Sequence, residues 1–134
     1  MDVFQIKARF GLRLPDSHLR CLSDPRDPIH DACDFLLLES PLELLRLGDV
    51  NEFLHDRKNW DRWPDHLVAF ASNGCGDYYA YDLRSSPHRV VYIDPDKTVS
   101  ENLASADPLT YRSFDEWRAD QLIKHASTKQ RQGR

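Results

Sequence analysis

The chain has 134 residues, 40% of them hydrophobic and 30% charged, which is the composition of one ordinary globular domain and excludes fibrous and disordered classes. Its net charge of −4 and pI near 5.8 argue against binding to a nucleic-acid backbone and favour a basic protein partner. Its apolar runs, such as residues 35–38, are far shorter than the roughly 20 residues that span a bilayer, and the first residues show no secretory signal. We therefore expect a single cytoplasmic domain over residues 1–127, with no membrane role.

The first predicted helix begins after Asp2, whose short side chain suits an N-cap. Gly11 has the conformational freedom that a left-handed helix terminator needs. Between these two residues, one face of the helix carries the apolar side chains Val3, Ile6 and Phe10.

A short helix over residues 16–22 is predicted after the Leu14-Pro15 step, because the residue before a proline favours an extended backbone. Leu19 and Leu22 should face inward from this helix. The next element is a strand over residues 34–39, whose continuous apolar run suits a strand covered on both faces. A buried helical turn is the alternative for that run.

Ser40-Pro41-Leu42-Glu43 combines an N-cap serine, a proline at the first helical position and a glutamate at the third. A helix should therefore start there. Gly48-Asp49 should interrupt it, and a second or kinked helix would then carry Phe53 and Leu54.

Two tryptophans, Trp60 and Trp63, precede Pro64. Each offers about 200 Å² of surface to bury, so both should pack at least partly against the core. Aromatic side chains are also enriched at protein interfaces, so a binding role is the alternative.

The clearest pattern is a hairpin of two strands, over residues 67–72 and 77–83, joined by a cluster of turn-forming residues. Gly74 and Gly76 can adopt positive φ without a steric clash, as such a turn requires. A second turn then leads to a strand over residues 89–94, whose β-branched run favours sheet structure. Three consecutive antiparallel strands are predicted.

The carboxy-terminal part begins with a predicted loop over residues 98–108, with a helical turn around 101–103. Ser113-Phe114-Asp115-Glu116 is a capping box that should start a final helix, running to about Ser127 and packing onto the sheet. The basic residues 128–134 are expected to be a flexible tail. The elements together predict an α+β fold, a twisted, mostly antiparallel sheet with amino- and carboxy-terminal helices packed on it.

The hairpin resembles the SUKH superfamily, the Smi/Knr-type cell-wall-assembly-regulator domain. In that family an apolar strand meets a Gly-x-Gly-Asp turn and an aromatic strand that ends in Asp, which matches Phe70, Gly74-Cys75-Gly76-Asp77, Tyr78-Tyr79 and Asp82. The Leu14-Pro15 step after the first helix and the Ser113-Phe114-Asp115-Glu116-Trp117 segment are also similar. Members often carry an Asn-Gly turn soon after the Leu-Pro helix, whereas this chain has the sequence Ser-Asp-Pro-Arg-Asp-Pro at residues 23–28, so a different loop is expected there.

Acidic residues near the strand ends are the candidates for acid–base chemistry: Asp77, Asp82, Asp94 and Asp96, with His88 nearby. Because aspartate at a strand end commonly caps a turn, we interpret these residues as structural, or as an acidic edge for a basic partner. The alternative is a small hydrolase, which would require Asp77, Asp82 and Asp94 to converge in one pocket with raised pKa values.

No cofactor or metal site is expected from the sequence. The six histidines and three cysteines show no zinc-ligand spacing, and Gly74-Cys75-Gly76 lacks the lysine of a phosphate-binding loop. Cys75 is interpreted as a small residue in a tight loop and not as a catalytic thiolate. Cys21, Cys33 and Cys75 form no Cys-x-x-Cys pair, so reduced thiols are expected.

The resemblance implies the same fold class and, for bacterial members, immunity proteins that bind and neutralise toxins. We therefore predict a non-enzymatic protein-binding domain that occludes a toxin stoichiometrically, with a cationic nuclease as the electrostatically suited partner. A regulatory scaffold of the cell-wall-assembly type is the alternative. Tyr79 should face an uncovered side of the sheet if Tyr78 faces the helices. The predicted partner-binding residues are Trp60, Trp63, Asp77, Tyr79, Asp82 and Asp94.

Overall fold

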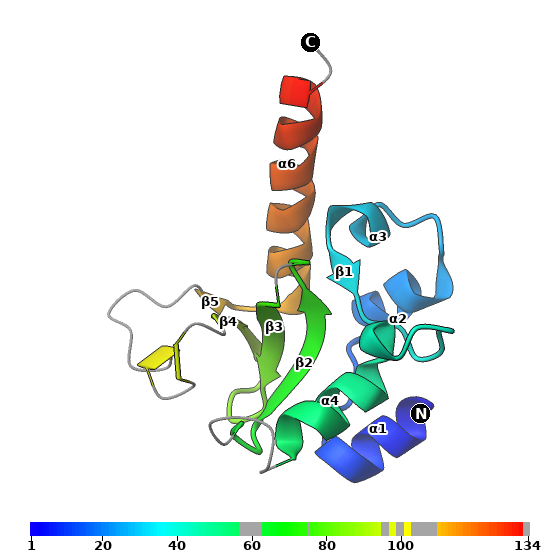
Figure 1. The fold of residues 1–134 in the computed structure, drawn as a ribbon, viewed down its shortest axis with the longest axis vertical. Coiled ribbons are helices and arrows are strands. Elements are labelled where there is room, and N and C mark those ends of the chain that lie inside the picture. The colour runs from blue at the N-terminus through cyan, green and yellow to red at the C-terminus, as the bar shows by residue number, and fades with distance from the viewer. Residues whose placement is uncertain (57–62, 75, 95–96, 99–100, 103–109, 133–134) are drawn as a thin grey trace.

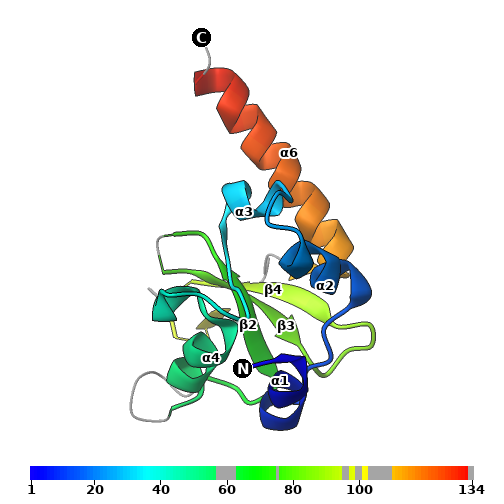
Figure 2. The same ribbon diagram turned by 90° about the vertical axis from the view of Figure 1, so that its right-hand side faces the viewer.

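The computed structural model describes residues 1–56, 63–74, 76–94, 97–98, 101–102 and 110–132. Its strands form one antiparallel sheet whose spatial order follows the chain: β1 (Asp34–Phe35), β2 (Leu67–Ser72), β3 (Tyr78–Asp82), β4 (Arg89–Ile93) and β5 (Thr110–Tyr111). The helical elements are α1 (Val3–Phe10), α2 (Asp16–Ser23), α3 (Ile29–Ala32), η1 (Glu43–Leu45), α4 (Leu47–His55) and α6 (Phe114–Gln132). Helices from both ends of the chain accompany the sheet (Figures 1 and 2), which confirms the α+β class.

The hairpin of β2 and β3 forms where the sequence predicts it. Gly74 and Gly76 have φ values of 87° and 94°, in the region that favours glycine. Asn73 closes the turn, since its backbone N–H donates to the Asp77 carbonyl at 3.2 Å and its side-chain amide donates to the Asp77 carboxylate at 3.2 Å. The predicted third strand follows as β4.

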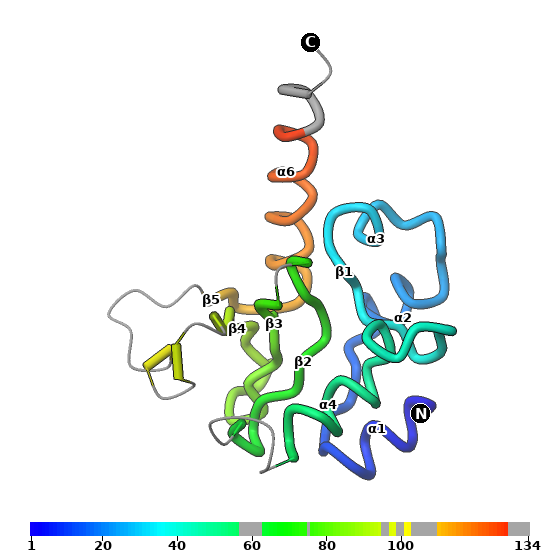
Figure 3. Tube along the Cα trace, viewed as in Figure 1, coloured from blue at the N-terminus to red at the C-terminus, as the bar shows by residue number. Residues whose placement is uncertain are grey.

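The first helix also forms as predicted. The Asp2 carboxylate accepts a hydrogen bond from the Gln5 backbone at 2.9 Å, the Gln5 side chain accepts one from the Asp2 backbone, and Gly11 ends the helix with a φ of 76°. An ion pair of 3.0 Å joins Arg9 to Glu52, and α1 lies beside α4 in the backbone trace of Figure 3. The buried residues of α1 are Ile6 and Phe10.

The buried face of α2 differs from the prediction. His18 and Cys21 are buried, whereas Leu19 and Leu22, which we expected inside, are only half-buried and pack at the edge of the core. His18 is accommodated because aromatic rings surround it, with ring centroids 4.6 Å from Phe114, 5.0 Å from Phe35, 5.4 Å from Phe70 and 5.7 Å from Tyr81. Leu22, four residues after His18, lies at the border of the same buried face and is only partly covered.

The strand predicted over residues 34–39 is shorter than expected. β1 ends at Phe35, and the Leu36 N–H still donates to the Phe70 carbonyl at 3.0 Å. Leu37 instead forms an isolated parallel bridge with Arg46. The chain therefore leaves the sheet after the first residues of the apolar run.

The helix predicted from Ser40 is replaced by the single turn η1 and by α4, which starts at Leu47. The bridge to Leu37 holds Arg46 extended, with φ −93° and ψ 121°, so a continuous helix cannot pass through it. Gly48, which we expected to interrupt a helix, lies inside α4, where a Cβ atom would come within 2.9 Å of Met1 Cγ.

The last helix, α6, starts at the predicted capping serine, since Ser113 Oγ accepts from the Glu116 N–H at 3.2 Å. Trp117 is fully buried, with its ring 4.7 Å from Phe70 and 5.4 Å from Tyr79. The helix continues to Gln132, beyond the end predicted near Ser127, and its last turns project past the sheet (Figures 1 and 2).

Candidate functional site

The two aromatic residues proposed for binding that the structure describes are buried. Trp63 is 4% exposed, and its Nε1 donates to the Leu67 carbonyl at 2.7 Å. Tyr79 is 6% exposed beneath α6, with its hydroxyl 3.4 Å from Gln121 Oε1, so the expected uncovered position is wrong. Tyr78 is directed to the other side of the sheet, where its ring lies 6.3 Å from Trp63. Trp60 lies outside the described residues.

Asp82 is held by its neighbour Arg84. Its carboxylate accepts hydrogen bonds from Arg84 Nε at 3.1 Å, Nη2 at 3.0 Å and the backbone N–H at 3.0 Å. Burial acts to raise the pKa of Asp82, but the hydrogen bonds and charge of Arg84 outweigh it and lower the pKa below its ordinary value. The side chain therefore stabilises the turn after β3 and stays ionised.

The three aspartates do not gather at one edge as expected. Tyr78 pairs with Ile93 at one end of the β3–β4 pair, and Asp82 pairs with Arg89 at the other. Asp77, just before β3, and Asp94, just after β4, therefore lie at the end opposite to Asp82. Four residues of strand lie between Asp77 and Asp82, so their Cα atoms are about 17 Å apart. The convergence that the hydrolase alternative required is therefore not found.

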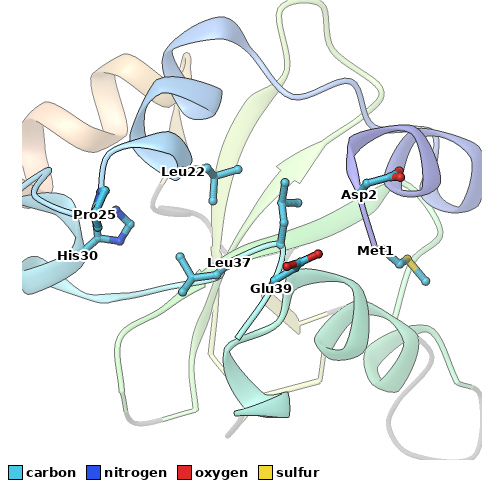
Figure 4. Close-up of a pocket in the computed structure, with 8 residues that line it drawn as sticks. Met1, Asp2, Leu22, Pro25, His30, Leu37 and Glu39 are labelled. Atoms are coloured by element: carbon cyan, nitrogen blue, oxygen red, sulfur yellow. The ribbon is translucent and has the colours of Figure 1, made fainter. Parts of the chain in front are cut away.

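A cleft of about 570 Å³ opens between the start of α1, the end of α2 and the chain after β1, and we call it the α2 cleft (Figure 4). Its apolar lining consists of Met1, Leu22, Pro25, Leu37 and Leu38. Its polar lining consists of Asp2, His30 and Glu39. Such a mainly apolar concavity with a few polar groups has the character of a binding site.

The fold explains why leucines line this cleft. Residues 36–39 leave the sheet to bridge toward Arg46, so Leu37 and Leu38 are only half-buried and no strand covers them. Leu22 lies at the border of the buried face of α2 that carries His18 and Cys21, so part of its side chain lines the cleft. The exposed apolar surface thus follows from the two places where the fold departs from the sequence-based expectation.

The wall formed by residues 24–30 is fixed by hydrogen bonds. His30 Nε2 donates to the carbonyls of Cys21 at 2.9 Å and Asp24 at 3.1 Å. The Asp27 carboxylate accepts from Arg118 of α6 at 2.9 and 3.1 Å. This is the loop where the sequence departs from the usual Asn-Gly turn, and it is attached to α6.

The charged side chains of the α2 cleft are acidic. Asp2 and Glu39 are exposed, and in the described part of the chain neither forms an ion pair. The chain that leaves the cleft at Glu39 carries Leu42 and Leu44, which are 60% and 83% exposed. Adjacent apolar and acidic surface of this kind is suited to a partner with apolar and cationic side chains.

Sequence reasoning did not find this cleft. Leu22 and Leu37 have the same side-chain chemistry as core leucines, and their position depends on distant contacts. The available signal was the spacing of Leu42 and Leu44, since leucines at positions i and i+2 cannot both lie on the buried face of one helix.

Other kinds of site are not supported by the described residues. None of their histidines, cysteines or acidic residues gather in threes where a metal ion could be held. Burial raises the pKa of the Cys33 thiol to about 12, and burial with the nearby Asp27 carboxylate raises that of Cys21, so neither is an activated nucleophile. Across the described part of the chain, every helix is too short or too polar to cross a membrane.

Comparison with protein-family models identifies the family of this chain. Neither the curated proteins nor the solved structures contain a match to this chain. The model of the SMI1 / KNR4 family (SUKH-1) matches residues 2–120, which includes α1, the hairpin and the start of α6. The chain therefore belongs to the SMI1 / KNR4 family (SUKH-1).

Proposed function

We propose that this protein is an immunity protein that neutralises a toxin by binding it stoichiometrically, with the α2 cleft as part of the binding surface. The main support for this proposal is the mainly apolar α2 cleft. Its charged side chains, Asp2 and Glu39, are carboxylates that form no ion pair among the described residues. Family membership supports it, since the resemblance to bacterial SUKH members implies this role.

The electrostatics agree with a cationic target. The net charge of −4 would attract a basic toxin and accelerate its association, while the apolar walls of the cleft would bury partner side chains in the complex. Inhibition would come from occlusion of the toxin's own active site. No catalytic step by this chain is needed.

The test uses the polypeptide encoded beside the gene of this protein. The two proteins are purified, mixed and passed over a size-exclusion column, and the neighbouring polypeptide is expressed in cells with and without this protein. We expect a one-to-one complex and rescue of growth. An unrelated acidic protein with the same net charge is the control for non-specific attraction.

The outcomes separate the immunity role from its rival. A complex with a non-toxic neighbour would favour a regulatory scaffold of the cell-wall-assembly type over immunity. If the neighbouring polypeptide forms no complex with this protein and remains toxic in its presence, the proposed immunity role is refuted.

A further inference from the structure

We infer that the α2 cleft and a second cleft beside it form one groove that binds an extended segment of a partner protein, with apolar side chains along α2 and a cationic side chain at the Asp2–Glu39 end. This inference rests on the proposed function and specifies the chemistry of the partner.

The second cleft has a volume of about 330 Å³ and lies between α1 and α2. Its apolar lining includes Val3, Phe4, Leu14 and Leu19. Phe4 is 80% exposed, which is unusual for an aromatic side chain whose helix has a well-buried opposite face. An apolar side chain of a partner would find contact area on both Phe4 and Leu19.

The two clefts adjoin each other along α2. Leu22 lines the first and Leu19 the second, and residues three apart on a helix are neighbours on one face. At the opposite wall, the consecutive residues Asp2 and Val3 line one cleft each. A single extended segment can therefore contact both clefts by placing alternate side chains in them.

The charge changes sign along this groove. The α2 cleft carries the carboxylates of Asp2 and Glu39, whereas in the second cleft the cations Lys7 and Arg13 outnumber Asp16. Within the described part of the chain, Glu39, Lys7 and Arg13 form no ion pair with one another or with other side chains. Opposite charges at the two ends would fix the direction in which a segment binds.

The probe for this inference is a phage-displayed library of short random peptides, panned against the purified wild-type protein. We expect enrichment of peptides with apolar residues in the middle, a Lys or Arg toward one end and an acidic residue toward the other. An enriched peptide is then synthesised with a fluorescent label, and its Kd is measured by anisotropy.

Charge-reversal variants locate the binding. Glu39→Lys and Lys7→Glu should each weaken peptide binding about tenfold, because a favourable pair becomes a repulsive one at a partly exposed site. Glu101→Lys and Arg112→Glu are the matched controls, since both residues are exposed and line neither cleft. The controls should leave the Kd unchanged, and circular dichroism should show that all four variants fold.

The inference is overturned if the library yields no enriched peptide, or if enriched peptides bind Glu39→Lys and Lys7→Glu as tightly as the controls. Its failure is distinguishable from that of the proposed function. A toxin that binds and is neutralised equally well by both groove variants would refute the groove and leave immunity intact. Peptides that bind the groove of a protein that binds no neighbouring toxin would support the groove and refute the immunity role.

Discussion

The side-chain amide of Asn51 forms hydrogen bonds in both directions with the backbone of Ala69. Asn51 Nδ2 donates to the Ala69 carbonyl at 2.8 Å, and the Ala69 N–H donates to Asn51 Oδ1 at 2.8 Å. β1 pairs with β2 only at residues 71 and 72, so this part of the edge of β2 has no neighbouring strand. A helix side chain therefore takes the place of a strand, and α4 is fixed against the sheet.

Replacing Asn51 with alanine should lower the free energy of unfolding by about 2–4 kcal/mol, because it leaves both buried backbone groups of Ala69 unpaired. Urea denaturation followed by fluorescence measures this. Glu52→Ala, on the next residue, is the control and should cost less than about 1 kcal/mol, since its ion pair with Arg9 is exposed. Equal midpoints for the two variants would show that the Asn51 bonds contribute little.

Stability should fall in acid because of His18. This side chain is fully buried, its Nδ1 lies 2.6 Å from the Tyr81 hydroxyl, and desolvation lowers its pKa from 6.5 to about 3. Below pH 6.5 His18 becomes protonated in the unfolded chain, whereas in the folded chain it stays neutral down to about pH 3. The free energy of unfolding should therefore decrease by up to about 1.4 kcal/mol for each pH unit across that window.

Urea denaturation of wild type and His18→Gln at several pH values between 7.5 and 4 isolates this effect. The variant retains a polar partner for Tyr81 but has no titrating group at this position. Its stability should depend less on pH than that of the wild type. The remaining slope comes from other groups, including His55 and His66, whose pKa values burial also lowers. Parallel pH profiles would contradict a buried neutral His18.

The ion pair between Asp27 and Arg118 should stabilise both the fold and the wall of the α2 cleft. Both side chains are largely covered, with exposures of 15% and 30%. Arg118→Met should cost about 1–3 kcal/mol and increase hydrogen exchange in residues 24–30. A double-mutant cycle with Asp27→Asn should give a coupling of about 1 kcal/mol, and independent effects of the two substitutions would rule this pairing out.

Trp63 should prove structural. Trp63→Phe retains an aromatic ring but removes the Nε1 donor to the Leu67 carbonyl, which His55 Nε2 also contacts at 3.0 Å. We expect a loss of about 1 kcal/mol in urea denaturation and no change in partner affinity under conditions where the variant is folded. A large loss of affinity at unchanged stability would restore the binding role first considered for this residue.

The sequence by itself determined the elements whose signals are local. The Asp2 cap, the Gly11 terminator, the glycine turn between β2 and β3 and the Ser113 start of α6 depend on backbone conformations that a few adjacent residues favour. Alternation was less informative in β3, where we expected Tyr79 on the uncovered side. The face that a strand buries is decided by where α6 packs, which the strand itself does not encode.

Only the tertiary structure decided which apolar side chains are buried and which line a surface. His18 is buried because four aromatic rings, from β1, β2, β3 and the start of α6, enclose it, whereas Leu19 and Leu22 of the same helix are only partly covered. The apolar run after β1 leaves the sheet because Leu37 pairs with Arg46, which lies nine residues away. Burial depends on contacts between segments distant in sequence, and a leucine of the core and a leucine of a binding groove are therefore indistinguishable until those segments have come together.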